Sequence, residues 1–197
     1  MDIDTRLITE PGQRINILIM KNNLLLTIII LLTSLGTTHA FHQQNNPPTS
    51  IENPKDSIRI AELDRYYAEL SRTVREGDYE GYGTGYHEDA IVIFASGKNK
   101  VSVPIVKALK GWKSGFDATK EGEADSFVEF RFSQRIGNET TAHDTGIFYY
   151  STCDKGEDPA VYITHFEMLL VKRDGVWIAM MEYQKADATL EEWEALK

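Results

Sequence analysis

The sequence predicts an α+β domain in which helices pack on one face of a curved antiparallel sheet. Three observations support this fold class. Apolar residues recur at helical spacing early in the domain, long β-rich runs fill its second half, and short turns containing Asn or Gly separate those runs. Helices that precede a set of antiparallel strands are typical of α+β proteins.

The helices are predicted from capping residues and apolar stripes. Asp56 or Ser57 can cap a first helix, which ends at Gly77. Its apolar stripe is Ile60, Leu63, Tyr67, Leu70 and Val74. A short second helix, weakened by glycines, covers 78–86 and carries Tyr79, Tyr82 and Tyr86 on one side. A third helix begins at Pro104, and its stripe is Ile105, Leu109, Trp112 and Phe116.

The strands are predicted from β-branched and aromatic runs. A short strand covers 90–95, and four long strands follow at 126–136, 140–152, 160–172 and 176–184. A last short helix is predicted because Thr189 and Glu192 have the spacing of a capping box. We therefore expect a single domain over 56–197, preceded by a flexible linker over 41–55 that is rich in Gln, Asn, Pro and Ser.

The first 40 residues indicate export. Lys21 precedes the apolar stretch Leu24–Leu32, and small residues end at Ala40, which is typical of a signal peptide cleaved after that residue. The apolar stretch is shorter than the roughly 20 residues that span a bilayer. We therefore expect a start at Met20 and a secreted or periplasmic protein without a membrane anchor after cleavage. N-terminal sequencing of the mature protein checks this expectation.

Composition excludes some classes of function. The 197-residue chain has a formal net charge of -9, and its acids and bases balance within residues 1–40. The negative charge therefore belongs to the later part and disfavours binding to nucleic acids or anionic lipids. Cys153 is the one cysteine, so no internal disulfide can form, and its acidic neighbours disfavour a reactive thiolate.

The turn Asp174–Gly175 predicts which side chains meet in the last hairpin. A two-residue turn makes Arg173 face Val176, which places Glu167 opposite Glu182. The same face then carries Val171, Ile178, Leu169, Met180, His165 and Gln184. The other face is also apolar, so something must cover it, and a homodimer that packs sheet against sheet is the simplest cover.

This register predicts a functional pocket. Two opposed carboxylates raise the pKa of at least one of them when buried, and a neighbouring imidazole can then exchange protons near neutral pH. The candidate catalytic residues are Glu167, His165 and Glu182. The expected pocket wall is Gln184, Met180, Asp144, Tyr67, Trp112 and Phe116. Two alternatives remain open: the group lies solvated at the open end of the sheet, or a three-residue turn disperses it.

No metal or cofactor is expected at this site. His165, Glu167 and Glu182 lie on predicted strands, which lack the helical spacing of a strong zinc motif. The expected partner is instead a small, partly apolar molecule whose polar end faces these three side chains.

Several motifs resemble those of a known family. A helix that ends in Gly77–Asp78, the turn Tyr86–Ala90, the stretch Ala142–Phe148 and the hairpin Val171–Trp177 resemble the SnoaL-like branch of the nuclear transport factor 2-like superfamily. The resemblance runs from about Ile58 to Gln184. It implies a cone-shaped fold with a pocket at its wide end, commonly dimeric through the sheet.

The resemblance leaves the activity open, because such proteins include steroid isomerases, scytalone dehydratase, polyketide cyclases, epoxide hydrolases and catalytically silent binding modules. Counted back from Gly175, Glu167 stands about where a steroid isomerase keeps its Asp base. The first expectation is an exported pocket protein that binds a small molecule. The alternatives are a cofactor-independent isomerase, dehydratase or hydrolase with Glu167 as base, and an interaction module that uses the outer sheet face.

Overall fold

The structure, a computed structural model, describes residues 54–98 and 100–197. The elements in chain order are α1 (Pro54–Glu76), α2 (Tyr79–Thr84), β1 (Tyr86–Phe94), β2 (Val101–Pro104), α3 (Ile105–Lys120), β3 (Ala124–Gly137), β4 (Thr141–Asp154), β5 (Ala160–Arg173), β6 (Val176–Asp187) and α4 (Leu190–Ala195). The predicted α+β class is confirmed.

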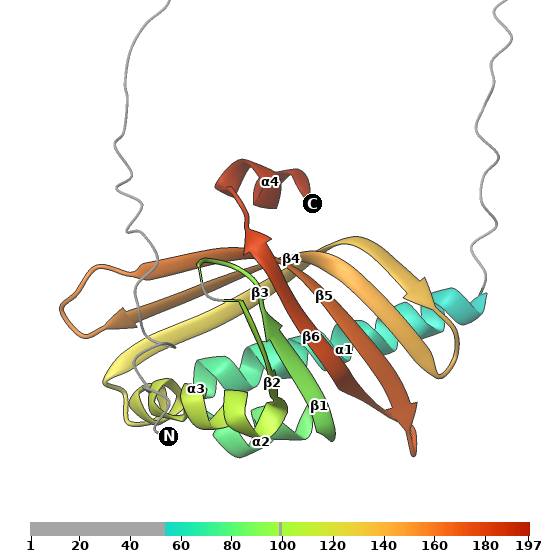
Figure 1. Cartoon of the computed structure of the whole chain (residues 1–197), viewed down its shortest axis with the longest axis horizontal. Coiled ribbons are helices and arrows are strands. Elements are labelled where there is room, and N and C mark those ends of the chain that lie inside the picture. The colour runs from blue at the N-terminus through green and yellow to red at the C-terminus, as the bar shows by residue number, and fades with distance from the viewer. Residues whose placement is uncertain (1–53, 99) are drawn as a thin grey trace, which may run out of the picture. The chain divides into compact units, whose positions relative to one another are not determined.

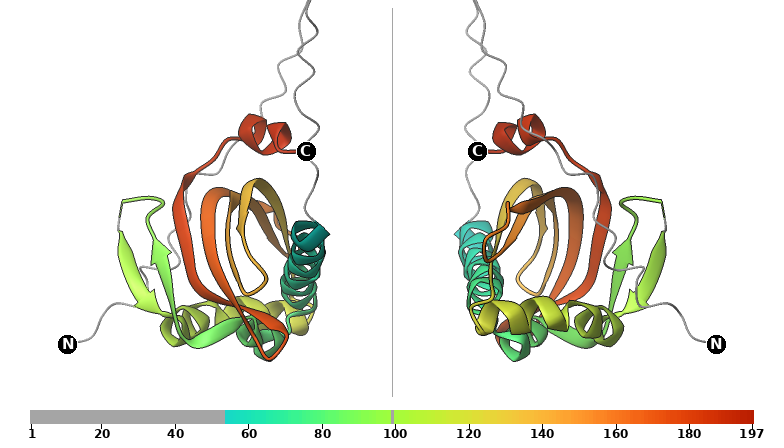
Figure 2. Two further views of the ribbon diagram at one scale, coloured as in Figure 1. Left: turned by 90° about the vertical axis from the view of Figure 1, so that its right-hand side faces the viewer. Right: turned by 90° about the vertical axis from the view of Figure 1, so that its left-hand side faces the viewer.

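The six strands form one curved, open sheet in the order β2-β1-β6-β5-β4-β3. All neighbours are antiparallel except β1 and β6, which run parallel. Helices α1, α2 and α3 lie on the concave side of the sheet, and α4 lies on the opposite side (Figures 1 and 2). We call the concave side the inner face and the opposite side the outer face.

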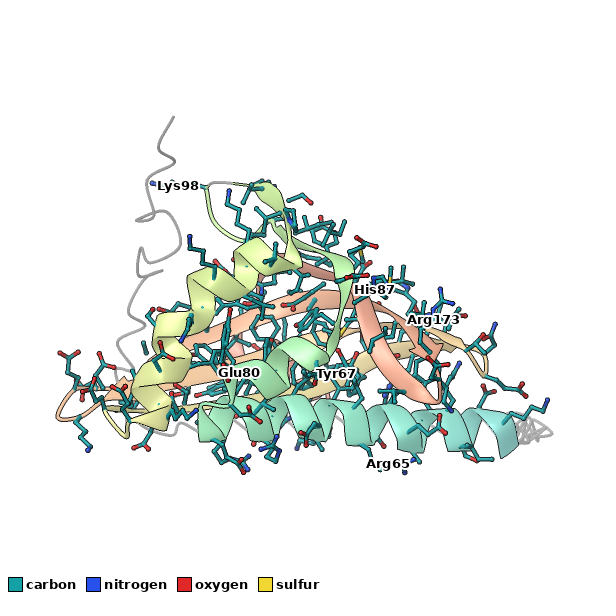
Figure 3. The ribbon with its side chains drawn as sticks, turned by 90° about the horizontal axis from the view of Figure 1, so that it is seen from below. Arg65, Tyr67, Glu80, His87, Lys98 and Arg173 are labelled. Carbon is teal, nitrogen blue, oxygen red and sulfur yellow. The ribbon has the colours of Figure 1, made fainter. Side chains whose placement is uncertain are left out.

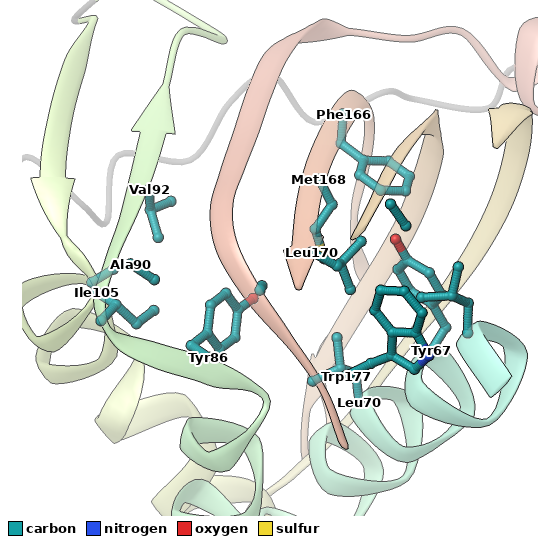
Figure 4. Packing of buried hydrophobic residues seen from close by; sticks show 14 of the residues in the cluster. Tyr67, Leu70, Tyr86, Ala90, Val92, Ile105, Phe166, Met168, Leu170 and Trp177 are labelled. Carbon is teal, nitrogen blue, oxygen red and sulfur yellow. The ribbon is translucent and has the colours of Figure 1, made fainter. Parts of the chain in front are cut away.

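The core lies between the inner face and the helices. Tyr67 of α1 points toward the sheet whereas Arg65 points away from it (Figure 3). The Tyr67 ring packs against Phe130, Phe132 and Phe166, with ring centroids 5.0, 4.7 and 6.4 Å away (Figure 4 shows Tyr67 and Phe166). Aromatic rings therefore join α1 to strands β3 and β5 of the inner face.

Helix α4 covers part of the outer face. Its Trp193 is 5% exposed and packs with Ile147 and Ile163. The guanidinium of Arg131 lies 4.1 Å from the centre of the Trp193 ring, and Arg131 Nη1 donates to the Trp193 carbonyl oxygen at 2.9 Å. Arg131 therefore joins β3 to the C-terminal helix.

A bulge in β3 depends on a glycine in β4. The β3–β4 register shifts between Phe132 and Gln134, which makes Ser133 the extra residue and places Arg135 opposite Asp144. A Cβ atom on Gly146 would lie 2.0 Å from the Arg131 carbonyl oxygen. Only glycine allows the two backbones to approach this closely.

Two elements differ from the prediction. Tyr86 begins β1 instead of ending a helix, because α2 ends at Thr84 with Gly85 as its C-cap residue. Strand β2 was not predicted, since it has four residues at the edge of the sheet. None of the helices within residues 54–98 and 100–197 is long and apolar enough to cross a membrane.

Candidate functional site

The predicted hairpin register holds near the turn and then fails. Asp174 and Gly175 have φ values of 51° and 81°, which suit a two-residue turn, and Arg173 pairs with Val176 as predicted. Farther along, Leu170 pairs with Ala179, but Leu169 pairs with Met181. Met180 is therefore an extra, half-buried residue in a bulge.

This bulge separates the two carboxylates that the sequence predicted to meet. Glu182 pairs with Met168 and lies on the inner face, whereas Glu167 pairs with Tyr183 and lies on the outer face. A shift of one residue moves every later side chain to the opposite face of a strand. The prediction that Glu167, Glu182 and His165 lie together on one face of the sheet is therefore wrong.

Glu167 forms ion pairs on the outer face. Lys185 Nζ lies 2.6 Å from its Oε1 atom, and His143 Nε2 lies 3.1 Å from its Oε2 atom. The hydrogen bond from Lys185, and after it that from His143, lowers the pKa of Glu167. His165 is also on this face and pairs with Glu192 of α4 at 3.3 Å. A carboxylate with a lowered pKa is a weak base, so Glu167 loses the support for its predicted role.

Glu182 is instead the acid of the interior, with 6% exposure. The Tyr86 hydroxyl donates to its Oε2 atom at 2.5 Å, and Gln184 Nε2 donates to its Oε1 atom at 2.8 Å. Burial raises the pKa of Glu182, and the two hydrogen bonds oppose this effect only in part. The site therefore holds a carboxyl group that can be neutral above the usual pH range of a glutamic acid.

Aromatic rings extend from Glu182 toward α3. The Tyr82 and Tyr86 hydroxyls lie 3.1 Å apart, which continues the hydrogen-bond chain from β1 to α2. The Tyr82 ring contacts Trp112 and Phe116, and Trp112 contacts Phe94. Tyr82, Trp112 and Phe94 are half-buried. The predicted pocket residues Trp112, Phe116 and Gln184 thus belong to one connected group. We call this group the Glu182 site; its other members are Glu182, Tyr86, Tyr82 and Phe94.

Asp144 and Tyr67 form a second polar group on the same face. Asp144 pairs with Met168 on one side, and Met168 pairs with Glu182 on the other, so one thioether separates two buried acids. Arg135 Nε donates to Asp144 Oδ2 at 3.2 Å. Burial raises the pKa of Asp144, although the neighbouring Arg135 guanidinium acts in the opposite direction.

Several polar atoms of this second group are unsatisfied. Within the described ranges, Tyr67 Oη, Arg135 Nη2 and Asp144 Oδ1 are buried without a hydrogen-bond partner, and so are Nε and Nη1 of Arg59. Buried polar atoms are usually satisfied, so this end of the interior can bond to a polar group of a ligand.

Two clefts lie elsewhere. One of about 430 Å³ lies on the outer face beside α4 and includes His165, Lys185 and Glu192, and one of about 340 Å³ lies between α1 and β3. No group of three His, Cys, Asp or Glu side chains in the described part of the chain is placed to hold a metal ion.

Sequence reasoning did not assign Tyr82 and Tyr86 to the site. The spacing of Tyr79, Tyr82 and Tyr86 is the available signal in the sequence, but this spacing also predicts one face of a helix. The structure brings the two hydroxyls together across the junction of α2 and β1, and only the position of Glu182 shows their role.

No family model matches the chain, and no curated protein is similar to it in sequence. Solved structures are similar in fold. A conserved protein from Planctomyces limnophilus is 8% identical with a TM-score of 0.55, and the match covers 67% of this chain and 98% of that chain. The protein Aln2 from a Streptomyces species is 12% identical with a TM-score of 0.52, over 65% of this chain and 90% of that chain.

An NTF-2-like protein of unknown function from Shewanella oneidensis is 15% identical with a TM-score of 0.49, over 64% of this chain and 98% of that chain. Such low identities concern the fold and leave the activity open. The fold of this chain, an α+β fold with one curved open sheet, is therefore similar to the folds of the Planctomyces limnophilus protein and of Aln2.

Proposed function

We propose that this protein is exported and binds a small, largely apolar molecule at the Glu182 site. The ligand stacks against Trp112 and Phe94, and its one polar group bonds to the Tyr82 hydroxyl. The observation that carries the proposal is the hydrogen-bond chain from buried Glu182 through Tyr86 to the half-buried Tyr82. Most ligand sites combine apolar walls with a few placed polar groups in this way.

The burial of Glu182 supports a functional rather than a purely structural role. A carboxyl group in an apolar interior destabilises a fold when it ionises, and a hydrophobic residue of similar size would avoid this effect. Perturbed pKa values are concentrated at functional sites. Asp144 and Tyr67, on the other side of Met168, offer a second set of polar atoms to a longer ligand.

Nile red, a neutral apolar dye with a carbonyl group, is a suitable probe. We expect Trp112→Ala to weaken its binding by about tenfold, because the variant removes a large aromatic surface from the site. The matched control is Phe127→Ala, which removes a 37%-exposed ring that stacks on Tyr149 outside the interior. Dye fluorescence measures both affinities. Equal affinities in the two variants would contradict the proposed site.

The outer face supports the proposal of a homodimer. One row of paired residues on this face crosses the strands β3, β4, β5, β6 and β1. In that order it consists of Ile136, His143, Leu169, Met181 and Ile91. Leu169 and Ile91 are 41% and 39% exposed. Because Lys185 and His143 already pair with Glu167, a second copy can cover this row without burying an unpaired carboxylate.

Leu169→Lys tests the dimer. We expect the unaltered protein to elute as a dimer and this variant as a monomer, because two lysines would meet at the centre of the interface. Val106→Lys is the control, since Val106 is 69% exposed on α3, away from the sheet. Size-exclusion chromatography with light scattering gives the masses. A monomeric unaltered protein would refute the dimer and favour an outer face that binds a different protein.

A further inference from the structure

The hydrogen-bond chain of the Glu182 site has a direction. A phenol has one hydrogen, and the Tyr86 hydroxyl donates it to Glu182 Oε2. The Tyr86 oxygen can then only accept, so Tyr82 donates its hydrogen to Tyr86 across 3.1 Å. When Glu182 is ionised, both hydroxyl hydrogens therefore point toward the carboxylate, and only lone pairs of the Tyr82 oxygen remain free.

Protonation of Glu182 reverses this direction. Gln184 Nε2 donates to Oε1, so that oxygen stays an acceptor and the added proton belongs on Oε2, which faces Tyr86. Tyr86 then accepts from Glu182 and donates to Tyr82. The Tyr82 hydroxyl hydrogen then has no acceptor among Glu182 and Tyr86, so it points away from the carboxyl group.

We propose that the protonation state of Glu182 selects the ligand by setting whether the Tyr82 hydroxyl donates or accepts. The neutral acid favours a ligand with a carbonyl or ether acceptor, and the carboxylate favours a ligand with an N–H or O–H donor. This inference rests on the proposed binding at the Glu182 site, and it adds the ligand chemistry and its control by pH.

Tyr82 is the least buried of the three residues Glu182, Tyr86 and Tyr82. It is half-buried, whereas Tyr86 and Glu182 are buried. Its ring lies 5.9 Å from Trp112 and 5.1 Å from Phe116, between centroids, so an aromatic ligand at Trp112 lies beside it. In the part of the chain that the structure describes, no other hydrogen bond continues from its hydroxyl.

The groups around Glu182 allow it to titrate separately. Tyr66 of α1, Tyr82 of α2 and Tyr86 of β1 face it, and burial raises the pKa of all three, so they stay protonated. On β4, Tyr150 also raises the pKa of Tyr82. Asp144 of the same strand lies on the far side of Met168 from Glu182 and accepts a hydrogen bond from Arg135. Burial also raises the pKa of Glu182 above 4.5, which moves its titration toward neutral pH.

Two small probes test the inference. Indole has an N–H donor and no good acceptor, and 1-indanone has a carbonyl acceptor and no donor. Both are two-ring molecules of similar size and remain uncharged from about pH 5 to about pH 9. We expect the ratio of their dissociation constants to change by about tenfold toward indole as the pH rises, because one hydrogen bond is gained and one lost. Calorimetry on the full chain measures both constants.

Two variants locate the cause. In Glu182→Gln the amide nitrogen donates to Tyr86 at every pH, so the variant should favour 1-indanone throughout. In Tyr82→Phe both probes should still bind, and their ratio should not depend on pH. Circular dichroism checks that each variant is folded.

The outcomes separate this inference from the proposed function. If Trp112→Ala weakens both probes but the ratio in the unaltered protein is constant with pH, the polarity inference is wrong and the binding site stands. A ratio that still changes with pH in Tyr82→Phe also overturns the inference. If Trp112→Ala leaves both affinities unchanged, the proposed binding site itself is wrong.

Discussion

Gly146→Ala is expected to lower the free energy of unfolding by about 2–4 kcal/mol, the range of severe overpacking. The added methyl group would lie 2.0 Å from the Arg131 carbonyl oxygen and 3.0 Å from the Phe132 Cα atom. Both are backbone atoms, so no side chain can move aside. The β3 bulge must shift, and Arg135 should then lose its alignment with Asp144.

Gly115→Ala is the matched control, and we expect it to raise the free energy of unfolding instead of lowering it. Gly115 is exposed on α3, and a Cβ atom there meets nothing within 4 Å. Alanine in a helix interior is more stable than glycine by up to about 1 kcal/mol. Urea unfolding of the two variants measures the difference. A Gly146→Ala variant as stable as the unaltered protein would show that the two strands are not in such close contact.

Glu182→Gln is expected to raise stability at neutral pH and to change its dependence on pH. The folded pKa of Glu182 lies above the unfolded value of 4.5, so the folded protein holds this proton more tightly than the unfolded chain. The stability that this group contributes is fully present below pH 4.5 and is lost as the pH rises through the folded pKa. Each unit of the shift corresponds to about 1.4 kcal/mol.

The difference between variant and unaltered protein isolates this effect, because their other ionisable groups are shared. Its size should grow from pH 4.5 upward in urea unfolding experiments. Glu167→Gln provides the contrast: the pKa of Glu167 is lowered, so its stabilising contribution is present above pH 4.5 and lost as the pH falls through the folded pKa. A difference for Glu182→Gln that is the same at every pH would mean that the carboxyl group is not coupled to folding.

Local patterns predicted most of the fold but not the pairing of distant strands. The turn at Asp174–Gly175 and the apolar stripes of α1 and α3 were visible in the sequence, because spacing and turn residues determine them. The parallel pairing of β1 with β6 was not. Its contacts join residues far apart in the chain, such as Tyr86 and Glu182, which are separated by 96 positions.

The candidate site was predicted in composition but not in arrangement. Glu182 and Gln184 do act together, yet one residue, Met180, decides which face Glu182 occupies. Strand β6 lies between β5 and β1, and its register is irregular on both sides at this point, since Tyr86 pairs with Ala179 and Ile91 with Met181. Alternation along one strand cannot reveal a bulge that two neighbouring strands produce together.

The position of β6 between β1 and β5 also determines when the domain can be completed. Strands β3, β4 and β5 are joined by hairpins and can assemble as they leave the ribosome, but β1 and β2 can join them only after residues 176–187 have been synthesised. Contacts between such distant segments slow folding, so we expect late, post-translational closure of the sheet. Until then β1 and β2 lack their partner strand β6 and are available to chaperones.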